Sequence, residues 1–172
     1  FLYFRKRNVT RHANILPYYS PSQIRKTGKI LTNVLENEKI PAITTPYFNF
    51  FELDVLCQMG KLTEVLDKIR SYWGGMLDLG AVTFWEEYDP SVPKEEQYDM
   101  YGDHFGKSLC HAWAASPIYF LAKYFAGLDL VNKDGVTYVL KPQMQYFTDL
   151  DCTLPVGSDG RSGWPGMENV WK

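Results

Sequence analysis

The residues with the clearest chemical potential lie in one short stretch, Gly74–Tyr88, which reads GGMLDLGAVTFWEEY. In it Trp85 directly precedes two carboxylates, Glu86 and Glu87. An apolar ring beside a carboxyl group can raise the pKa of that group or aim its oxygens at a bound water. The alternative is a surface loop in which Trp85 fills the core and both glutamates are solvated. The stretch alone favours the surface loop, because most pairs of charged residues are solvated.

His111 is the second candidate and lies within Ser108–Trp113, which reads SLCHAW. If this stretch is helical, Ser108, His111 and Ala112 share one face of the helix. His111 can then hydrogen-bond a substrate hydroxyl or orient a carboxylate. The alternative is a histidine whose ring is satisfied inside an apolar core.

Most other chemistries have no matching pattern. The phosphate loops GxGxxG and GxxxxGK[ST] are absent, and no nucleophile elbow occurs, although a dispersed Ser–His–Asp triad stays open. The histidines His12, His104 and His111 lack the spacing of a zinc motif, and the three cysteines form neither a metal motif nor a disulfide framework. We therefore expect free thiols and no cofactor or metal. The pattern that remains after these exclusions is carboxylates among aromatic residues, which is typical of enzymes that cleave glycosidic bonds.

Composition limits the class of protein and of partner. The chain has 172 residues, 45% of them hydrophobic, which suffices for one full core or one core and part of a second. A net charge of −2 argues against nucleic acid or an acidic membrane as the main partner. The first eight residues, FLYFRKRN, hold too short an apolar run for a signal peptide or a membrane span.

Apolar residues at helical spacing predict about six helices, arranged as hairpins, that must position these candidates. A capping pattern precedes two of these helices, and short connections favour antiparallel neighbours. The expected elements are a partial helix in Phe1–Tyr18, helices from Ser20 to about Asn37 and from Pro46 to about Met59, helices over Leu62–Trp73 and Ser108–Phe125, and a polar loop over Tyr88–Gly106.

Glycine and proline set the expected boundaries of these helices. Gly60 is expected to end one helix and to join it to the next in an antiparallel hairpin. Gly74 and Gly75 are expected to stop the helix before the Trp–Glu stretch, and Gly80 to let the backbone turn again. Pro117 is expected to kink or break the last helix one residue before it.

The C-terminal part favours β structure. A short strand is expected over Val136–Leu140 and a weaker one over Asp149–Leu154, with no regular structure in Gly157–Lys172. The expected domains are residues 1–130, which are helical, and residues 131–172, a truncated β-region with an irregular tail. Spacing alone suits either a helical bundle or part of an α/α toroid.

Several stretches resemble the α-L-rhamnosidases, a family of glycoside hydrolases. Gly80–Glu86, GAVTFWE, is similar to the G-A-x-T-x-W-E segment of that family. RHANILPYY with IPAITTPYFNFFELDVLCQMGK, and SLCHAWAASPIYFL, are similar to further family segments in the same order. These matches cover most of residues 11–127. LKPQ followed by LPVGSDG resembles the start of the C-terminal β-sandwich of the family.

The resemblance implies a six-hairpin (α/α)6 barrel that releases terminal α-L-rhamnose with inversion of configuration. It implies that Glu86 is the general base that activates water and that His111 contacts the sugar. We further infer that Trp85 and Trp113 wall the sugar pocket. Val82 departs from the pattern, because the family often has threonine at that position.

The resemblance also implies that part of the site lies elsewhere. An inverting site needs a second carboxyl group about 6.5–9.5 Å from the base. In this family that general acid lies upstream of the matched segments, and Phe1–Tyr19 holds no similar acidic motif. A closed six-hairpin barrel also needs about twice the helices expected here. We therefore expect the second half of a catalytic barrel, inactive until the missing N-terminal half completes it.

The expected substrate is a rhamnose-containing glycoside or polysaccharide. One alternative is a non-catalytic helical module that binds carbohydrate or a partner protein. Another is a different α/α-barrel glycosidase. A bacterial enzyme of this kind can be periplasmic, secreted or cytoplasmic, and the sequence does not give the compartment.

Overall fold

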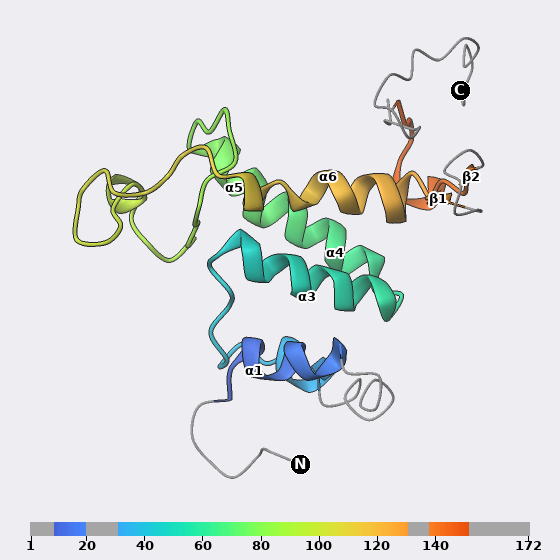
Figure 1. The fold of residues 1–172 in the computed structure, drawn as a ribbon, viewed down its shortest axis with the longest axis horizontal. Coiled ribbons are helices and arrows are strands. Elements are labelled where there is room, and N and C mark those ends of the chain that lie inside the picture. Colours follow the sequence, from blue (N-terminus) through green and yellow to red (C-terminus); the bar gives the residue numbers. More distant parts are fainter. Residues whose placement is uncertain (1–8, 20–30, 131–137, 152–172) are drawn as a thin grey trace. The chain divides into compact units, whose positions relative to one another are not determined.

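The computed structural model describes residues 9–19, 31–130 and 138–151 (Figure 1). About half of these residues are helical, and they include one two-stranded antiparallel sheet, so the expected mainly α class is confirmed. The chain divides into two compact units, Phe1–Ser116 and Pro117–Lys172. The domain boundary expected after residue 130 stays a prediction.

The N-terminal unit begins with the short helix α1 (Arg11–Ile15), which continues as a 3-10 turn over Leu16–Tyr19. Thr10 caps α1, because its hydroxyl accepts a hydrogen bond from the backbone N–H of Ala13 at 3.2 Å. Residues 31–35 form the described end of the next helix, which confirms its predicted end near residue 37, while its predicted start lies outside the described residues. Buried residues of these elements form one core cluster with residues from the connection and the helix that follow: Ile15, Tyr18, Leu31, Ile43 and Val55.

The predicted helical hairpin is confirmed. Helix α3 (Pro46–Gln58) begins after Thr45, and helix α4 (Leu62–Lys68) runs back beside it (Figure 1). Gly60 joins them with φ +75°, the left-handed conformation that glycine adopts without steric cost. The helical run then passes through a π-helical turn at Ile69–Trp73.

Gly74 and Gly75 do not stop this helix, contrary to the prediction. The run continues as α5 (Gly74–Asp78) and ends only near Gly80, whose φ is +91°. Gly75 is needed for space instead, because a Cβ atom there would lie 2.6 Å from Cζ of Tyr88. Close packing against a residue later in the chain explains this glycine.

The stretch Ser108–Phe125 is not one helix, which corrects a second prediction. Residues 108–111 are irregular, and Ala112–Ala114 forms a single 3-10 turn. Helix α6 (Ser116–Phe120) starts one residue before Pro117 and continues as a π-helical turn over Leu121–Phe125. A helix therefore starts where a kink or break within a longer helix was predicted. Proline fits the first turn of this helix, where its missing N–H costs no hydrogen bond.

The C-terminal unit contains the small sheet. Strand β1 (Leu128–Leu130), which the sequence pattern missed, pairs antiparallel with β2 (Tyr138–Leu140). β2 confirms the last part of the strand predicted over Val136–Leu140. Residues 149–151 are not a strand, and the rest of the weaker predicted strand and the tail lie outside the described residues.

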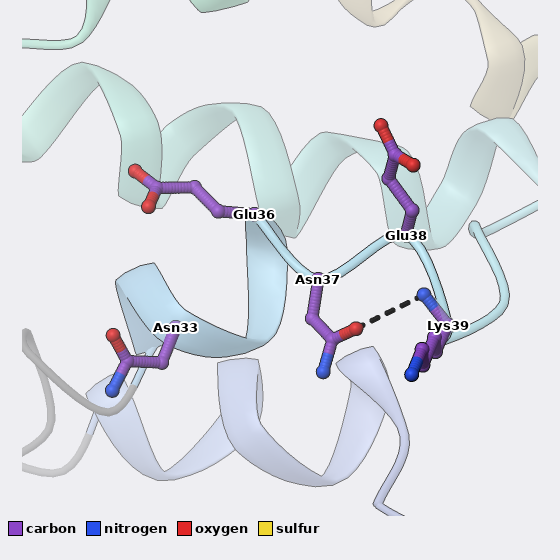
Figure 2. Close-up of a pocket in the computed structure, with 5 residues that line it drawn as sticks. All are labelled: Asn33, Glu36, Asn37, Glu38 and Lys39. Atoms are coloured by element: carbon purple, nitrogen blue, oxygen red, sulfur yellow. Dashed lines mark hydrogen bonds between the residues drawn. The ribbon is translucent and has the colours of Figure 1, made fainter.

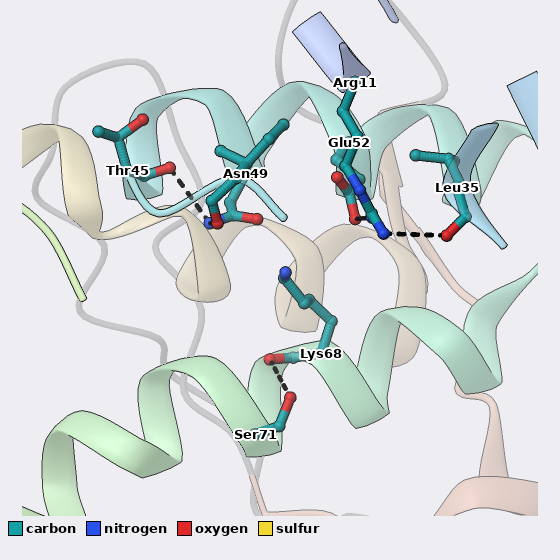
Figure 3. A network of polar contacts seen from close by, with 8 residues as sticks. Arg11, Leu35, Thr45, Asn49, Glu52, Lys68 and Ser71 are labelled. Atoms are coloured by element: carbon teal, nitrogen blue, oxygen red, sulfur yellow. Dashed lines mark hydrogen bonds and ion pairs between the residues drawn. The ribbon is translucent and has the colours of Figure 1, made fainter. Parts of the chain in front are cut away.

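A polar network crosses the core of the helical unit (Figure 3). Arg11 on α1 donates to Glu52 Oε1 on α3 at 2.8 Å and to the carbonyl of Leu35 at 3.0 Å. Lys68 reaches from α4 toward α3, and burial lowers the pKa of its ammonium group. Because Glu52 is only 3% exposed, Arg11 supplies a charge partner that the buried carboxylate requires.

Candidate functional site

Two irregular segments, one before and one after the long polar loop, pair through their backbones. The N–H of Glu86 donates to the carbonyl of Ser108 at 2.9 Å. The N–H of His111 donates to the carbonyl of Phe84 at 2.8 Å. These two bonds bring together residues that are more than twenty positions apart in the sequence. They place Glu86 and His111 on the same side of the molecule.

Hydroxyl groups fix the same stretch on either side of Glu86. Thr83 donates its hydroxyl hydrogen to the carbonyl of Leu109. Thr44, in the connection that leads into α3, donates to Glu87 Oε1 at 2.7 Å. The two neighbouring glutamates therefore have different partners, and the carboxylate of Glu87 is bound by Thr44.

The Glu86 carboxylate lies just below the surface, with a side chain that is 9% exposed. Its Oε1 accepts a hydrogen bond from the Tyr101 hydroxyl at 2.8 Å, and its Oε2 accepts one from the Ser108 N–H at 3.1 Å. Nδ1 of His111 lies 3.9 Å from Oε2. A carboxylate has about four acceptor positions. Two of them are filled by these donors, so the group keeps capacity for a water or a substrate hydroxyl.

The electrostatic environment keeps Glu86 ionised. Burial disfavours the charged form, but the hydrogen bonds from Tyr101 and Ser108 and the charges of His111 and Lys107 outweigh it. The pKa of Glu86 therefore lies below its ordinary value. Sequence analysis gave two possibilities for this carboxyl group, and the one in which its pKa is raised is wrong. The lowered pKa leaves an ionised acceptor whose oxygens are held by Tyr101 and Ser108.

The expected helical face of Ser108, His111 and Ala112 does not exist. His111 has extended backbone angles, φ −123° and ψ 115°, and follows the segment that pairs with Phe84. The imidazole reaches Glu86 through this pairing, and helical periodicity plays no part in it.

The two tryptophans lie in different environments. Trp85 is 3% exposed and packs edge-on against Tyr98, with ring centroids 5.5 Å apart. Trp113 is 47% exposed, and its ring centroid lies 4.1 Å from that of His111. Tyr47 on α3 extends this exposed aromatic surface, 5.5 Å from Trp113. The structure therefore places Trp113 beside His111, whereas Trp85 belongs to the buried core.

Sequence reasoning missed three residues of the site: Tyr101, Lys107 and Tyr47. Lys107 is 8% exposed, and burial lowers the pKa of its ammonium group. Tyr101 lies in the polar loop predicted over Tyr88–Gly106 and Lys107 lies directly after it, and no local pattern points from either residue to Glu86. The tyrosine–glycine pair at residues 101–102 was the one available signal, because it suggests a tight turn.

An open hollow of about 460 Å³ lies in another part of the helical unit (Figure 2). In it the backbone N–H of Lys39 donates to Asn37 Oδ1 at 3.0 Å. All of its lining side chains are exposed, so it holds no desolvated polar group for chemistry, and we place the candidate site at Glu86. The lining residues are Asn33, Glu36, Asn37, Glu38 and Lys39.

Within the described ranges, no three histidine, cysteine or acidic side chains come together in a way that suits a metal ion. No helix in the same ranges has the length and apolar character needed to cross a membrane. In comparisons with known proteins, no family model matches the chain and no curated protein matches it. The geometry around Glu86 is therefore the main support for a functional proposal.

Proposed function

We propose that this chain belongs to a glycoside hydrolase that releases terminal α-L-rhamnose with inversion, and that Glu86 is the general base. One observation carries the proposal: the ionised, nearly buried Glu86 carboxylate lies beside His111, whose ring in turn contacts the exposed ring of Trp113. The motif resemblance around Gly80–Glu86 gives the sugar. Aromatic rings beside a carboxylate suit a sugar that presents C–H groups on one face and hydroxyls at its edge.

The chemistry requires a base that is charged before the reaction begins. A Glu86 oxygen accepts a proton from water while the water oxygen bonds to the anomeric carbon on the face opposite the leaving group. The glycosidic C–O bond breaks, and the leaving oxygen takes a proton from a general acid. The lowered pKa of Glu86 suits the first role and not the second.

We assign the general acid to a segment N-terminal to the matched stretches, because the resemblance places it there. The same segment would supply the remaining hairpins of an (α/α)6 barrel. The antiparallel α3–α4 hairpin supports this arrangement, and β1 with β2 would begin the β-sandwich.

The neighbouring glutamate provides a matched control for the test. In the full-length protein, Glu86→Gln should lower turnover of an aryl α-L-rhamnoside by about 10²–10⁴-fold with little change in sugar affinity. A small anion such as azide should partly restore turnover of this variant. Glu87→Gln removes a carboxylate that Thr44 holds, and should stay within a few-fold of wild type. Undiminished activity of Glu86→Gln would overturn the assignment.

The exposed pair of Trp113 and Tyr47 favours a second candidate, a module that binds sugar without cleaving it. Calorimetric titration with rhamnose and with unrelated sugars separates the two. A binding module binds rhamnose and shows no turnover in the full-length protein. A panel of aryl glycosides separates the rhamnosidase from another α/α-barrel glycosidase.

A further inference from the structure

The hydroxyl of Tyr101 is placed over the candidate base by an unusual turn. We propose that Tyr101 is a positioning residue, which fixes one oxygen of Glu86 so that the other side of the carboxylate presents its free acceptor positions to a water. This inference rests on the proposed function, because it assigns a role within the same site.

The turn is a two-residue hairpin. The N–H of Met100 donates to the carbonyl of Asp103 at 3.0 Å, and the N–H of Asp103 returns a bond to Met100 at 2.9 Å. Both central residues are left-handed, with φ +55° at Tyr101 and +82° at Gly102. Glycine adopts such angles freely, whereas a bulky aromatic residue does so at a cost in conformational energy. Left-handed residues of this kind cluster at functional sites.

The surrounding loop holds the strained turn in place. Gly106 lies so close to the turn that a Cβ atom there would meet the carbonyl group of Met100. The ring of Phe105 stacks on Tyr98, with centroids 6.3 Å apart, and the N–H of Lys107 donates to the Tyr98 carbonyl at 3.2 Å. These contacts close the loop on itself before and after the turn.

Packing of the Tyr101 ring does not offset the strain. Tyr101 is 80% exposed, so its ring removes little apolar surface from water. Its hydroxyl instead reaches Glu86 Oε1 at 2.8 Å. That hydrogen bond also raises the pKa of the Tyr101 hydroxyl, which stays a donor at neutral pH. The turn thus delivers one hydroxyl hydrogen to one carboxylate oxygen.

The consequence for Glu86 is geometric and electrostatic. Tyr101 holds Oε1 and the Ser108 N–H holds Oε2, so the plane of the carboxylate is fixed by two donors. The titratable groups that face Glu86 are Tyr101 from the turn, Lys107 at the end of the loop and His111 beyond it. Removal of the tyrosine hydroxyl leaves the other two in place, so its effect can be measured separately.

The test is Tyr101→Phe, which keeps the ring and removes the hydroxyl. In the full-length protein we expect kcat to fall about tenfold, because a hydrogen bond to a charged group is lost, with little change in KM. The acidic limb of the kcat/KM profile should move to higher pH. Tyr98→Phe removes a hydroxyl from the same loop without touching Glu86, and should leave rate and profile unchanged.

A direct titration makes the result independent of activity. Carbon-13 NMR of labelled glutamate, with Glu86→Gln to identify the signal, should show a higher pKa for Glu86 in Tyr101→Phe and an unchanged one in Tyr98→Phe. An unchanged Glu86 titration with an unchanged acidic limb overturns the role of Tyr101. If Glu86→Gln keeps full activity, the proposed function fails, while the NMR titration still decides whether Tyr101 sets the state of this carboxylate.

Discussion

The ring of Tyr88 occupies the space where a side chain on Gly75 would lie, with Tyr88 Cζ 2.6 Å from the position of a Cβ atom. The backbone of Tyr88 is held at the same point, because its N–H donates to the carbonyl of Thr44 at 3.1 Å and to the hydroxyl of Tyr72 at 3.2 Å. Gly74 is the residue before Gly75 in the same helix, and a Cβ atom on Gly74 would meet no neighbour. Gly75 thus lets the end of the Trp–Glu stretch pack directly on the helix.

This difference predicts opposite effects for two adjacent substitutions. Gly74→Ala should raise the free energy of unfolding by about 0.5–1 kcal/mol, since alanine is the better helix former and meets no neighbour. Gly75→Ala should lower it by about 1–3 kcal/mol, because the ring of Tyr88 must move. Urea denaturation of both variants provides the measurement, with equal m-values as the check that only stability has changed.

A double variant identifies the cause. Tyr88→Ala removes the ring, so adding Gly75→Ala to it should cost much less than Gly75→Ala costs alone. Equal effects of Gly74→Ala and Gly75→Ala would contradict the packing argument.

The two glycines also show where sequence reasoning about helices reaches its limit. Gly60 was correctly predicted to end a helix, and its φ of +75° is the reason. Gly74 is also a glycine, but its backbone angles are helical, φ −60° and ψ −38°. Local composition cannot distinguish these cases, because the reason for Gly75 is a ring thirteen residues further along the chain. Helical hairpins with local connections were predictable, and boundaries set by distant contacts were not.

The candidate site was likewise predictable only in part. Residue type and family resemblance were enough to name Glu86, His111 and Trp113 as candidates. Their proximity depends on backbone pairing between Phe84 and His111, which spacing alone does not reveal. Tyr101 was missed because its contact with Glu86 depends on a left-handed turn inside a loop that reads as solvated.

Removal of one partner from the buried ion pair of Arg11 and Glu52 should strongly destabilise the folded chain. Arg11→Met would keep much of the side-chain volume but leave the Glu52 carboxylate, 3% exposed, without its guanidinium. We expect a loss of about 3 kcal/mol, the usual result when one partner of a buried pair is removed.

Lys61 and Glu36 form a matched exposed pair at 2.8 Å. Glu36→Gln should change the free energy of unfolding by less than about 1 kcal/mol in the same urea experiment. Similar losses in the two variants would show that burial does not govern the first pair.

Stability should depend on pH through Glu86. The folded-state pKa of this carboxyl is lowered from the ordinary value of 4.5, so its ionisation stabilises the folded chain above that pH. This contribution is lost as the pH falls from 4.5 through the folded-state pKa. The free energy of unfolding of wild type should therefore fall more steeply below pH 4.5 than that of Glu86→Gln, in urea titrations at a series of pH values. Equal slopes would mean that Tyr101, Ser108 and His111 do not stabilise the charged form.

Substitutions of the two tryptophans should separate an effect on stability from an effect on sugar binding. Trp85 is 3% exposed, and Trp85→Ala should cost about 3–5 kcal/mol of stability through loss of buried contacts. Trp113 is 47% exposed, so Trp113→Ala should change stability by about 1 kcal/mol or less.

The same Trp113→Ala substitution should weaken rhamnose binding in the full-length protein about five- to tenfold, since one aromatic face of the proposed wall is lost. Trp113→Phe keeps an aromatic ring beside His111 and should recover most of that affinity. Calorimetric titration with rhamnose measures binding, and urea denaturation measures stability. If Trp113→Ala binds rhamnose as tightly as wild type, the exposed ring is not a wall of the sugar site. The proposed site would then have to lie on another side of Glu86, facing away from Trp113.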